Sequence, residues 1–345
     1  MEYKYLPDIS ENLDFRRKPI TEKDRITGEI PYYGASGIVD YVEDYIFDEN
    51  LLLVSEDGAN LLMRSTPIAF SIFGKTWVNN HAHVLKFSDN KLQEYVELYL
   101  NSISLEPYIT GSAQPKLNQN RLNEIPIPIP DEQTIVKIIN QFSIVKSLIS
   151  LRKQQLAKLD KLVKARFVEL FGDPIRNTQN RPTTDFINVV KMQRGFDLPV
   201  QDRQQDGNVP VFGSNGALDR HNVAKVQGGG VITGRSGTIG KVYYTEGDYW
   251  PLNTSLFSVD THGNNIVYLA YLLQMYDLSR FTEGTGVPTL NRNKFHNEPI
   301  IDVPLDEQEL FASFVKQTDK SKSAIQQSLD KLETLKGALM QEYFG

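Results

Sequence analysis

The chain has no cysteine among its 345 residues and only five histidines. The absence of cysteine excludes a disulfide framework and thiolate metal sites, and it is typical of a protein from a reducing compartment. No run of 18 or more apolar residues occurs, and the first residues lack the basic and apolar segments of a signal peptide. We therefore expect a soluble, cytoplasmic protein.

Sequence signatures of catalysis are also scarce. There is no Gly-x-Ser-x-Gly elbow and no His-Glu-x-x-His pair, and no paired carboxylates recur in an apolar setting. The glycine-rich segment 228–241 has the look of a phosphate-binding loop. However, Arg235 stands where that motif needs its first glycine, and Val242 stands where a Ser or Thr must reach Mg²⁺. A tight turn between strands explains the segment, and we predict a binding protein without catalytic residues.

The histidines do not predict a metal site. His81 and His83 would share one face of a strand, but the aligned positions in the second half of the chain are Thr254 and Leu256. The sequence offers no third ligand near them. We expect no metal and no cofactor to be bound by this chain.

The net charge of −6 argues against a protein that simply coats nucleic acid. Its distribution is uneven, since segment 131–172 has eight Lys and Arg against four Asp and Glu, whereas segment 1–130 has 12 against 19. If nucleic acid is the ligand, the basic groups must be concentrated on one face, or a basic partner must neutralise much of the phosphate charge.

What the sequence does contain is an internal repeat. The segment Ile30-Pro-Tyr-Tyr-Gly-Ala-Ser-Gly37 through Ser55-Glu-Asp-Gly58 recurs as Val209-Pro-Val-Phe-Gly-Ser-Asn-Gly216 through Gly234-Arg-Ser-Gly237. Downstream, 111–122 recurs as 284–295, and each copy contains Pro-x-Leu-Asn-x-Asn. Each copy is followed by a proline-spaced strand and by Asp-Glu-Gln, at 131–133 and 306–308. A repeating unit of roughly 175 residues is too long for a solenoid, so the pattern predicts two tandem domains.

A long amphipathic helix is predicted after each domain. Apolar residues from Ile135 to Leu170 and from Leu310 to Leu339 mostly follow a spacing of three and four. Gly172 and Pro174 are typical of residues that end the first helix. We predict domains at 1–130 and 173–305 and spacer helices at 131–172 and 306–345. The simplest packing joins the two apolar stripes antiparallel, although each helix could instead lie on its own domain.

Short β-like runs and single helices within each copy predict an irregular, loop-rich α+β fold. Together, the ordered repeat, the Pro-x-Leu-Asn-x-Asn segments, the Asp-Glu-Gln helix starts and Phe171-Gly-Asp-Pro174 resemble the specificity subunit of type I restriction-modification systems. The resemblance covers nearly the whole chain. It implies a pseudo-twofold internal repeat of two target-recognition domains, separated by two long helices packed as an antiparallel coiled coil.

The resemblance also implies function and partners. In such complexes this subunit is not an enzyme, and each domain reads one half of a bipartite target in double-stranded DNA. Two methyltransferase subunits dock on it and supply adenine methylation and S-adenosylmethionine, while restriction subunits supply ATP- and Mg²⁺-dependent translocation and cleavage. Half-sites read from one face of B-DNA lie near 34 Å apart, so two readers need a rigid spacer of that order.

Residue types that read DNA are abundant in the repeated loops. In the first domain the candidates are Tyr32, Tyr33, Ser36, Gln114, Lys116, Asn118, Gln119, Asn120 and Arg121. In the second domain they are Ser214, Asn215, Arg220, Arg235, Thr289, Asn291, Arg292 and Lys294. Any single one of them could instead be a turn residue that satisfies its own backbone.

Comparison of the two copies divides these candidates into residues that support the fold or contact phosphate and residues that discriminate bases. Positions that agree, such as Asn118 with Asn291, suggest scaffold or phosphate contact. Positions that differ suggest base discrimination, because the two halves of an asymmetric target must be read differently; these are Lys116 with Thr289, Gln119 with Arg292, and Asp57 with Ser236. Arg121 and Lys294 keep their charge and are predicted to contact phosphate.

Three alternatives stay open at this stage. The chain could be an enzyme with an unrecognised active site, which turnover by the purified chain would reveal. It could be a tandem scaffold or adhesin that binds protein or sugar, which an absence of DNA affinity would reveal. It could also serve a methylation-only complex that has no nuclease.

Overall fold

The computed structural model describes residues 2–111, 114–284 and 288–345. The chain divides into two compact units, one formed by 1–151 with 328–345 and the other by 152–327. Each unit therefore contains one copy of the repeat and part of both long helices. Of the repeated loops, residues 112–113 and 285–287 lie outside the described residues.

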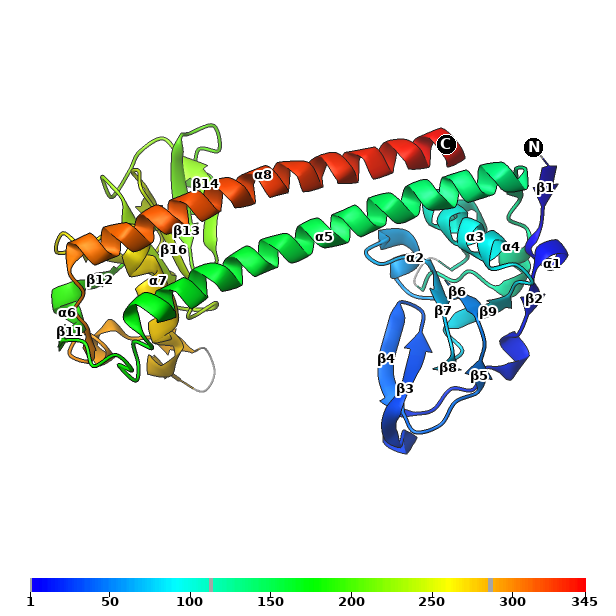
Figure 1. The fold of residues 1–345 in the computed structure, drawn as a ribbon, viewed down its shortest axis with the longest axis horizontal. Coiled ribbons are helices and arrows are strands. Elements are labelled where there is room, and N and C mark those ends of the chain that lie inside the picture. The colour runs from blue at the N-terminus through cyan, green and yellow to red at the C-terminus, as the bar shows by residue number, and fades with distance from the viewer. Residues whose placement is uncertain (1, 112–113, 285–287) are drawn as a thin grey trace. The chain divides into compact units, whose positions relative to one another are not determined.

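The two long helices are α5 (Glu132–Phe171) and α8 (Leu305–Phe344), each an uninterrupted ribbon of 40 residues (Figure 1). Asp131 caps the start of α5, since its carboxylate accepts a hydrogen bond from the Thr134 amide at 2.9 Å. The helix ends at Gly172, whose φ of +77° is the left-handed conformation that favours glycine. The helix thus runs from Glu132 to Phe171, between the cap at Asp131 and the glycine at 172.

Within each unit the two helices pack antiparallel. In the first unit, Phe142 of α5 stacks on Phe344 of α8 with ring centroids 6.2 Å apart. In the second unit, Phe167 of α5 contacts Phe311 of α8 at 5.5 Å, and Asp160 pairs with Lys322 at 2.6 Å. Residue numbers rise along one helix as they fall along the other, which confirms the predicted antiparallel coiled coil.

By length and composition alone, α5 could cross a membrane. Its core-facing apolar side chains are packed against protein, with Ile138 and Phe142 buried in the first unit and Val163 and Phe167 buried in the second, whereas others such as Ile144 are exposed. The opposite face carries lysine and arginine. The helix is therefore amphipathic and contributes one face to the core of each unit.

The sheets repeat between the units with the same strand order. In the first unit, β1 pairs with β10, and the larger sheets have the orders β2-β9-β6-β7 and β4-β3-β8-β5. In the second unit, β11 pairs with β21, and the larger sheets are β12-β18-β15-β16 and β14-β13-β17. The counterpart of β5 is a single bridge between Val226 and Tyr249. The internal repeat predicted from sequence is confirmed in the topology.

The strands of the first unit are β1 (Glu2–Lys4), β2 (Glu11–Asn12), β3 (Thr27–Gly34), β4 (Gly37–Val42), β5 (Phe47–Asp48), β6 (Leu51–Ser55), β7 (Ala69–Ile72), β8 (Lys75–Val78), β9 (Ala82–Lys86) and β10 (Ile127–Ile129). Those of the second are β11 (Thr183–Asp185), β12 (Lys191–Arg194), β13 (Val209–Gly213), β14 (Gly216–His221), β15 (Gly230–Gly234), β16 (Val242–Thr245), β17 (Trp250–Pro251), β18 (Ser255–Asp260), β19 (Thr282–Glu283), β20 (Thr289–Leu290) and β21 (Pro299–Ile301). The shorter α-helices are α1 (Leu6–Ile9), α2 (Asn60–Met63), α3 (Asn90–Ser102), α4 (Gln119–Asn123), α6 (Phe186–Val189) and α7 (Ile266–Tyr276). The 3₁₀ turns are η1 (Asp14–Arg16), η2 (Glu22–Asp24), η3 (Glu106–Tyr108), η4 (Val200–Asp202), η5 (Leu278–Phe281) and η6 (Arg292–Lys294).

One helix covers a sheet in each unit, α3 on β6 and β7 and α7 on β15 and β16 (Figure 1). These helices also hold the strand that leads into the long helix. The Tyr95 hydroxyl donates to the carbonyl of Pro128 at 2.6 Å, and the Tyr276 hydroxyl donates to that of Pro299 at 2.9 Å. The proline-spaced strands are thereby fixed to the core, and the long helices begin from a rigid base.

Candidate nucleic-acid interface

Two of the repeated loops are hydrogen-bonded to each other in both units. In the first, Asp57 forms a bridge with Lys116, and the Leu117 amide donates to the Glu56 carbonyl at 2.7 Å. In the second, Ser236 forms a bridge with Thr289, and the Leu290 amide donates to the Arg235 carbonyl at 2.8 Å. Positions that differ between the copies are therefore neighbours in space, and the same backbone frame presents different side chains.

The hairpin turn of the repeat joins this group of loops. The Ser55 hydroxyl donates to the Ala35 carbonyl at 2.5 Å, so the turn lies beside the end of β6. Gly37 and Gly216 have φ values of +119° and +96°, which only glycine adopts readily. These matched glycines are explained by turn geometry.

The matched asparagines have a backbone role as well. Asn118 accepts from the Arg121 amide at 3.0 Å and caps α4, and Asn291 accepts from the Asn293 amide at 3.1 Å and caps η6. Their agreement between the copies thus comes from capping the turn that follows each loop.

Most other predicted residues lie at the surface on or beside these loops, whereas Arg220 lies on β14. Ser36, Gln114, Lys116, Gln119, Asn120, Asn215, Arg220, Asn291 and Lys294 are exposed, and Tyr33, Asn118, Arg121, Ser214, Arg235, Thr289 and Arg292 are partly buried. Lys294 pairs with Glu283 at 3.0 Å and Arg121 pairs with Glu124 at 2.5 Å, so both predicted phosphate contacts have a carboxylate partner in the free protein.

Tyr32 requires a correction. It is 1% exposed and belongs to the core of the first domain, where the Arg25 guanidinium lies 4.7 Å from its ring centroid. Its hydroxyl accepts a hydrogen bond from the Ile20 amide at 3.0 Å. The prediction that Tyr32 contacts DNA is wrong for this structure, because alternation along β3 turns its side chain inward.

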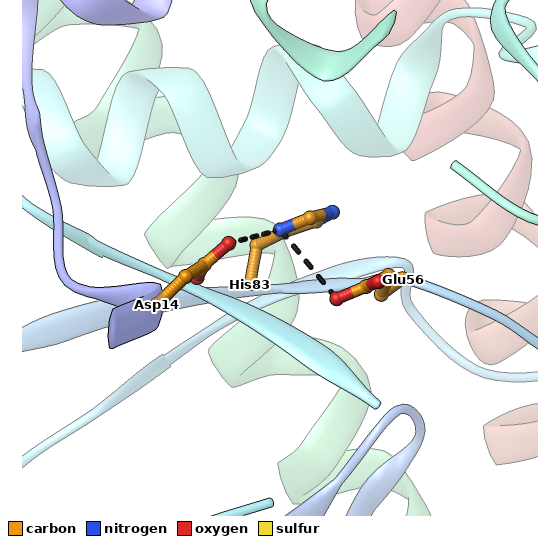
Figure 2. Close-up of side chains that lie close together, drawn as sticks. All are labelled: Asp14, Glu56 and His83. Carbon is orange, nitrogen blue, oxygen red and sulfur yellow. Dashed lines mark hydrogen bonds and ion pairs between the residues drawn. The ribbon is translucent and has the colours of Figure 1, made fainter. Parts of the chain in front are cut away.

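A buried ionic cluster lies beneath the loops of the first domain. Figure 2 shows His83 between Asp14 and Glu56, with its Nδ1 atom 2.6 Å from Asp14 Oδ2 and 3.8 Å from Glu56 Oε2. The Nε2 atom lies 2.8 Å from the carbonyl oxygen of Leu117. Because a carbonyl can only accept, Nε2 donates to Leu117, and Nδ1 faces the two acidic side chains.

Further cations complete the cluster. Arg17 contacts Glu56 at 2.6 Å and Asp14 at 3.3 Å, and Lys116 contacts Glu56 at 3.2 Å. Burial by itself raises the pKa of Asp14, but the hydrogen bond and charge of His83, with the Val84 amide and Arg17, outweigh it and lower that pKa. The pKa of Glu56 is also lowered, since Arg17, His83 and Lys116 outweigh the effect of its burial.

The same three side chains are the only group of described residues whose atoms could jointly hold a metal ion. The carboxylates are already neutralised by Arg17, Lys116 and His83, so the cluster is a complete ion-pair network. The expectation that His81 and His83 share a face is wrong, because His81 precedes β9. There it pairs with Asp57 at 2.9 Å.

The second domain has different chemistry at the matched place. Arg194 pairs with Leu256 across β12 and β18, just as the register around β2 and β9 places Asp14 beside His83. Arg235 stands where the first domain has Glu56. Together with Arg292, these arginines line a pocket of about 490 Å³ whose other members are Leu256, Glu283, Gly284, Thr289, Leu290 and Asn291.

The guanidinium groups of Arg194, Arg235 and Arg292 have no hydrogen-bond or ion-pair partner among the residues that the structure describes. Sequence reasoning selected Arg235 and Arg292 but missed Arg194. It precedes the aligned segment of the repeat, and only the pairing of β12 with β18 brings it to the pocket. The alternation along β12 was the one available signal.

Comparison with known proteins identifies the family to which this architecture belongs. A model of the type I restriction modification DNA specificity domain matches residues 1–161 and 176–334. The chain therefore belongs to that family, and its two copies are target-recognition domains.

Individual relatives agree with the family. The chain is 25% identical to a Haemophilus influenzae protein named as a type I restriction enzyme specificity subunit, covering 98% of this chain and 89% of the relative. The S subunit of a type I restriction-modification system from M. genitalium shares the fold with a TM-score of 0.66 at 14% identity, covering 100% and 96% of the two chains. A structure from work on assembly and conformational transition of the type I R-M system gives a TM-score of 0.59 at 14% identity, covering 99% and 97%.

Proposed function

We propose that this protein is the DNA-reading subunit of a type I restriction-modification complex, in which each domain reads one half of a bipartite target. The observation that carries the proposal is the duplicated loop frame. Both domains hold the loops at 56–57 with 116–117 and at 235–236 with 289–290 by the same hydrogen bonds, but present different side chains. Two domains that share a backbone arrangement but present different side chains are suited to recognising two different DNA sequences.

The residues proposed to reach DNA are the candidates named above without Tyr32. Lys116 and Gln119 in the first domain, and Arg235 and Arg292 in the second, have the side chains that discriminate base edges in the major groove. Lys294 and Arg121 are proposed to exchange their carboxylate partners for phosphate. With a net charge of −6, the chain depends on partner subunits for much of the phosphate neutralisation.

The long helices are the proposed docking surface for two methyltransferase subunits. Ile144, Leu148 and Leu151 of α5 are 60%, 39% and 51% exposed, and their spacing places them on one helix face. An apolar stripe of this kind is typical of a surface that another helix covers. In this proposal the partners act in the cytoplasm and bring the S-adenosylmethionine, while restriction subunits bring ATP and Mg²⁺.

The test is to reconstitute the complex with its methyltransferase subunits and map the methylated bases. We expect one target of two short half-sites separated by a fixed spacer. Lys116→Ala with Gln119→Ala should relax one half-site by about 5- to 150-fold in discrimination, and Arg235→Ala with Arg292→Ala should relax the other. Effects in the two domains should be additive, since the substituted residues belong to separate compact units.

Two results would contradict the proposal. Methylation without a two-part target would remove the assignment of one half-site to each domain. A chain truncated at Asp306 that still bound two methyltransferase subunits would remove the helices as the docking surface. The unmutated complex assayed in parallel is the control for both.

A further inference from the structure

The two domains place opposite charges at matched positions of the same frame. Where the first domain has Asp14, Glu56 and His83, the second has Arg194, Arg235 and Leu256. At a fourth matched position, the first domain has Gln119 and the second has Arg292. The first set is closed by its own ion pairs with Arg17 and Lys116, whereas the second lines an open pocket.

Because the charges at these matched positions are opposite, the residues there do not serve a role that both domains share, such as contact with the DNA backbone. The DNA backbone presents the same phosphates to each domain, so residues that serve only the backbone should match in charge. Arg121 and Lys294 do match, and Arg194 and Arg235 do not. The arginine pocket therefore distinguishes the second half-site from the first.

The pocket offers donors above an apolar floor. Leu256 and Leu290 are 2% and 1% exposed and form that floor. The carboxylate in the pocket wall, Glu283, pairs with Lys294 at 3.0 Å in the free protein and accepts a hydrogen bond from the Asn291 side-chain amide at 3.4 Å. Three guanidinium groups line the same pocket, so donors outnumber this carboxylate even when Lys294 exchanges it for phosphate. The ligand must then be rich in hydrogen-bond acceptors, because guanidinium groups donate and cannot accept.

We infer that this pocket takes the O6 and N7 edge of a guanine, so that the second half-site contains a guanine read by Arg292 with Arg194 and Arg235. This inference rests on the proposed function. Guanine is the base whose major-groove edge presents two acceptors side by side, which match the paired donors of arginine. The matched Gln119 of the first domain has the amide that pairs with adenine, so the two half-sites differ at this position.

The experiment replaces Arg292 with the residue of the first domain. In the reconstituted complex, Arg292→Gln should shift the preference at one position of the second half-site from guanine toward adenine. Arg194→Ala should lower discrimination at that same position by about 5- to 150-fold. Binding is measured against a library of single-base target variants at two salt concentrations, and thermal unfolding verifies that each variant is folded.

The matched control is Lys294→Gln combined with Glu283→Gln, which removes the proposed phosphate contact without leaving an unpaired carboxylate in the pocket wall. It should weaken all target variants alike and lower the salt slope by about 0.9. A second half-site without guanine, or an Arg292→Gln variant that weakens every sequence equally, would overturn the guanine assignment and indicate a phosphate site. If the unmutated complex shows no bipartite target, the proposed function itself fails, and the two failures are distinguishable.

Discussion

At the scale of single residues, the first domain stabilises its repeated loops with charge and the second with apolar contact. His83 donates to the Leu117 carbonyl, and Lys116 reaches Glu56, so the cluster holds the loop 116–117 in place. Leu256 occupies the position of His83 in the second domain and needs no such partners. A buried network of this kind depends on every member, because one unpaired buried charge costs several kcal/mol.

The first domain should lose stability when this network is broken. Asp14→Asn removes the carboxylate that lies 2.6 Å from His83 and leaves Glu56 as the one remaining carboxylate for His83, Arg17 and Lys116. We therefore expect the free energy of unfolding to fall by about 3 kcal/mol at pH 7. The pKa of Asp14 is lowered in the folded state, so its stabilising effect is complete above about pH 4 and is lost as the pH falls through the folded pKa. The penalty of Asp14→Asn should therefore shrink toward pH 3.

Urea unfolding followed by tryptophan fluorescence can measure this, because the chain has one tryptophan in each domain, Trp77 and Trp250. A Trp250→Phe background reports the first domain alone. Glu124→Gln is the control, since it breaks the exposed ion pair with Arg121 and should cost less than about 1 kcal/mol. A penalty for Asp14→Asn that is equal at pH 7 and pH 3 would argue against the ionic network.

At the scale of elements, the end of α8 is part of the first domain although it is the last segment of the chain. Phe344 contacts Tyr95 of α3 at 5.7 Å and Phe142 of α5 at 6.2 Å, and Tyr343 donates to Gln141 at 2.7 Å. Leu339 lies in the same core. The first domain is therefore completed by a segment that follows it by more than 150 residues.

Removal of this contact should destabilise the first domain. Phe344→Ala should lower the free energy of unfolding by about 3 kcal/mol, near the lower end of phenylalanine truncations because the ring is only partly buried. Leu335→Ala, which truncates a side chain of the same helix that is 46% exposed, should have a much smaller effect. Equal effects of the two substitutions on the Trp77 unfolding transition would show that α8 is not part of this core.

At the scale of the whole molecule, the continuous helices suggest that the chain measures the distance between half-sites. Four residues inserted in α5 after Lys153, with four matching residues in α8 after Gln327, add about 6 Å and a rotation of about 40°. We expect the mapped spacer to lengthen by one or two base pairs, at about 3.4 Å each, or specific binding to fail.

The insertion in α5 alone is the control, because it puts the two helices out of step and should impair folding or assembly. Methylation mapping of the reconstituted complex gives the spacer directly. An unchanged target with an unchanged spacer after the paired insertion would contradict the measuring role of the helices.

The sequence by itself determined what depends on local order along the chain. The periodicity of α5, its cap at Asp131 and its stop at Gly172 involve hydrogen bonds and packing within a few residues. The repeat could be detected in the sequence because each copy needs the same turns and caps. Its matched positions run from Gly34 and Gly213 to Asn118 and Asn291. This was sufficient to predict two α+β domains, the antiparallel helices and the family.

Only the tertiary structure decided which distant residues meet. Asp14 joins His83, and Arg194 joins Leu256, because β2 and β12 pair with β9 and β18. Strand pairing between residues 62 to 75 positions apart leaves no local signature. The pairing of β3 with β4 and β8 likewise places Tyr32 in the core, against Val42 and Trp77. Whether a charged side chain is neutralised in a buried network or left open in a pocket depends on these long-range neighbours, so the difference between the two domains emerged only from the fold.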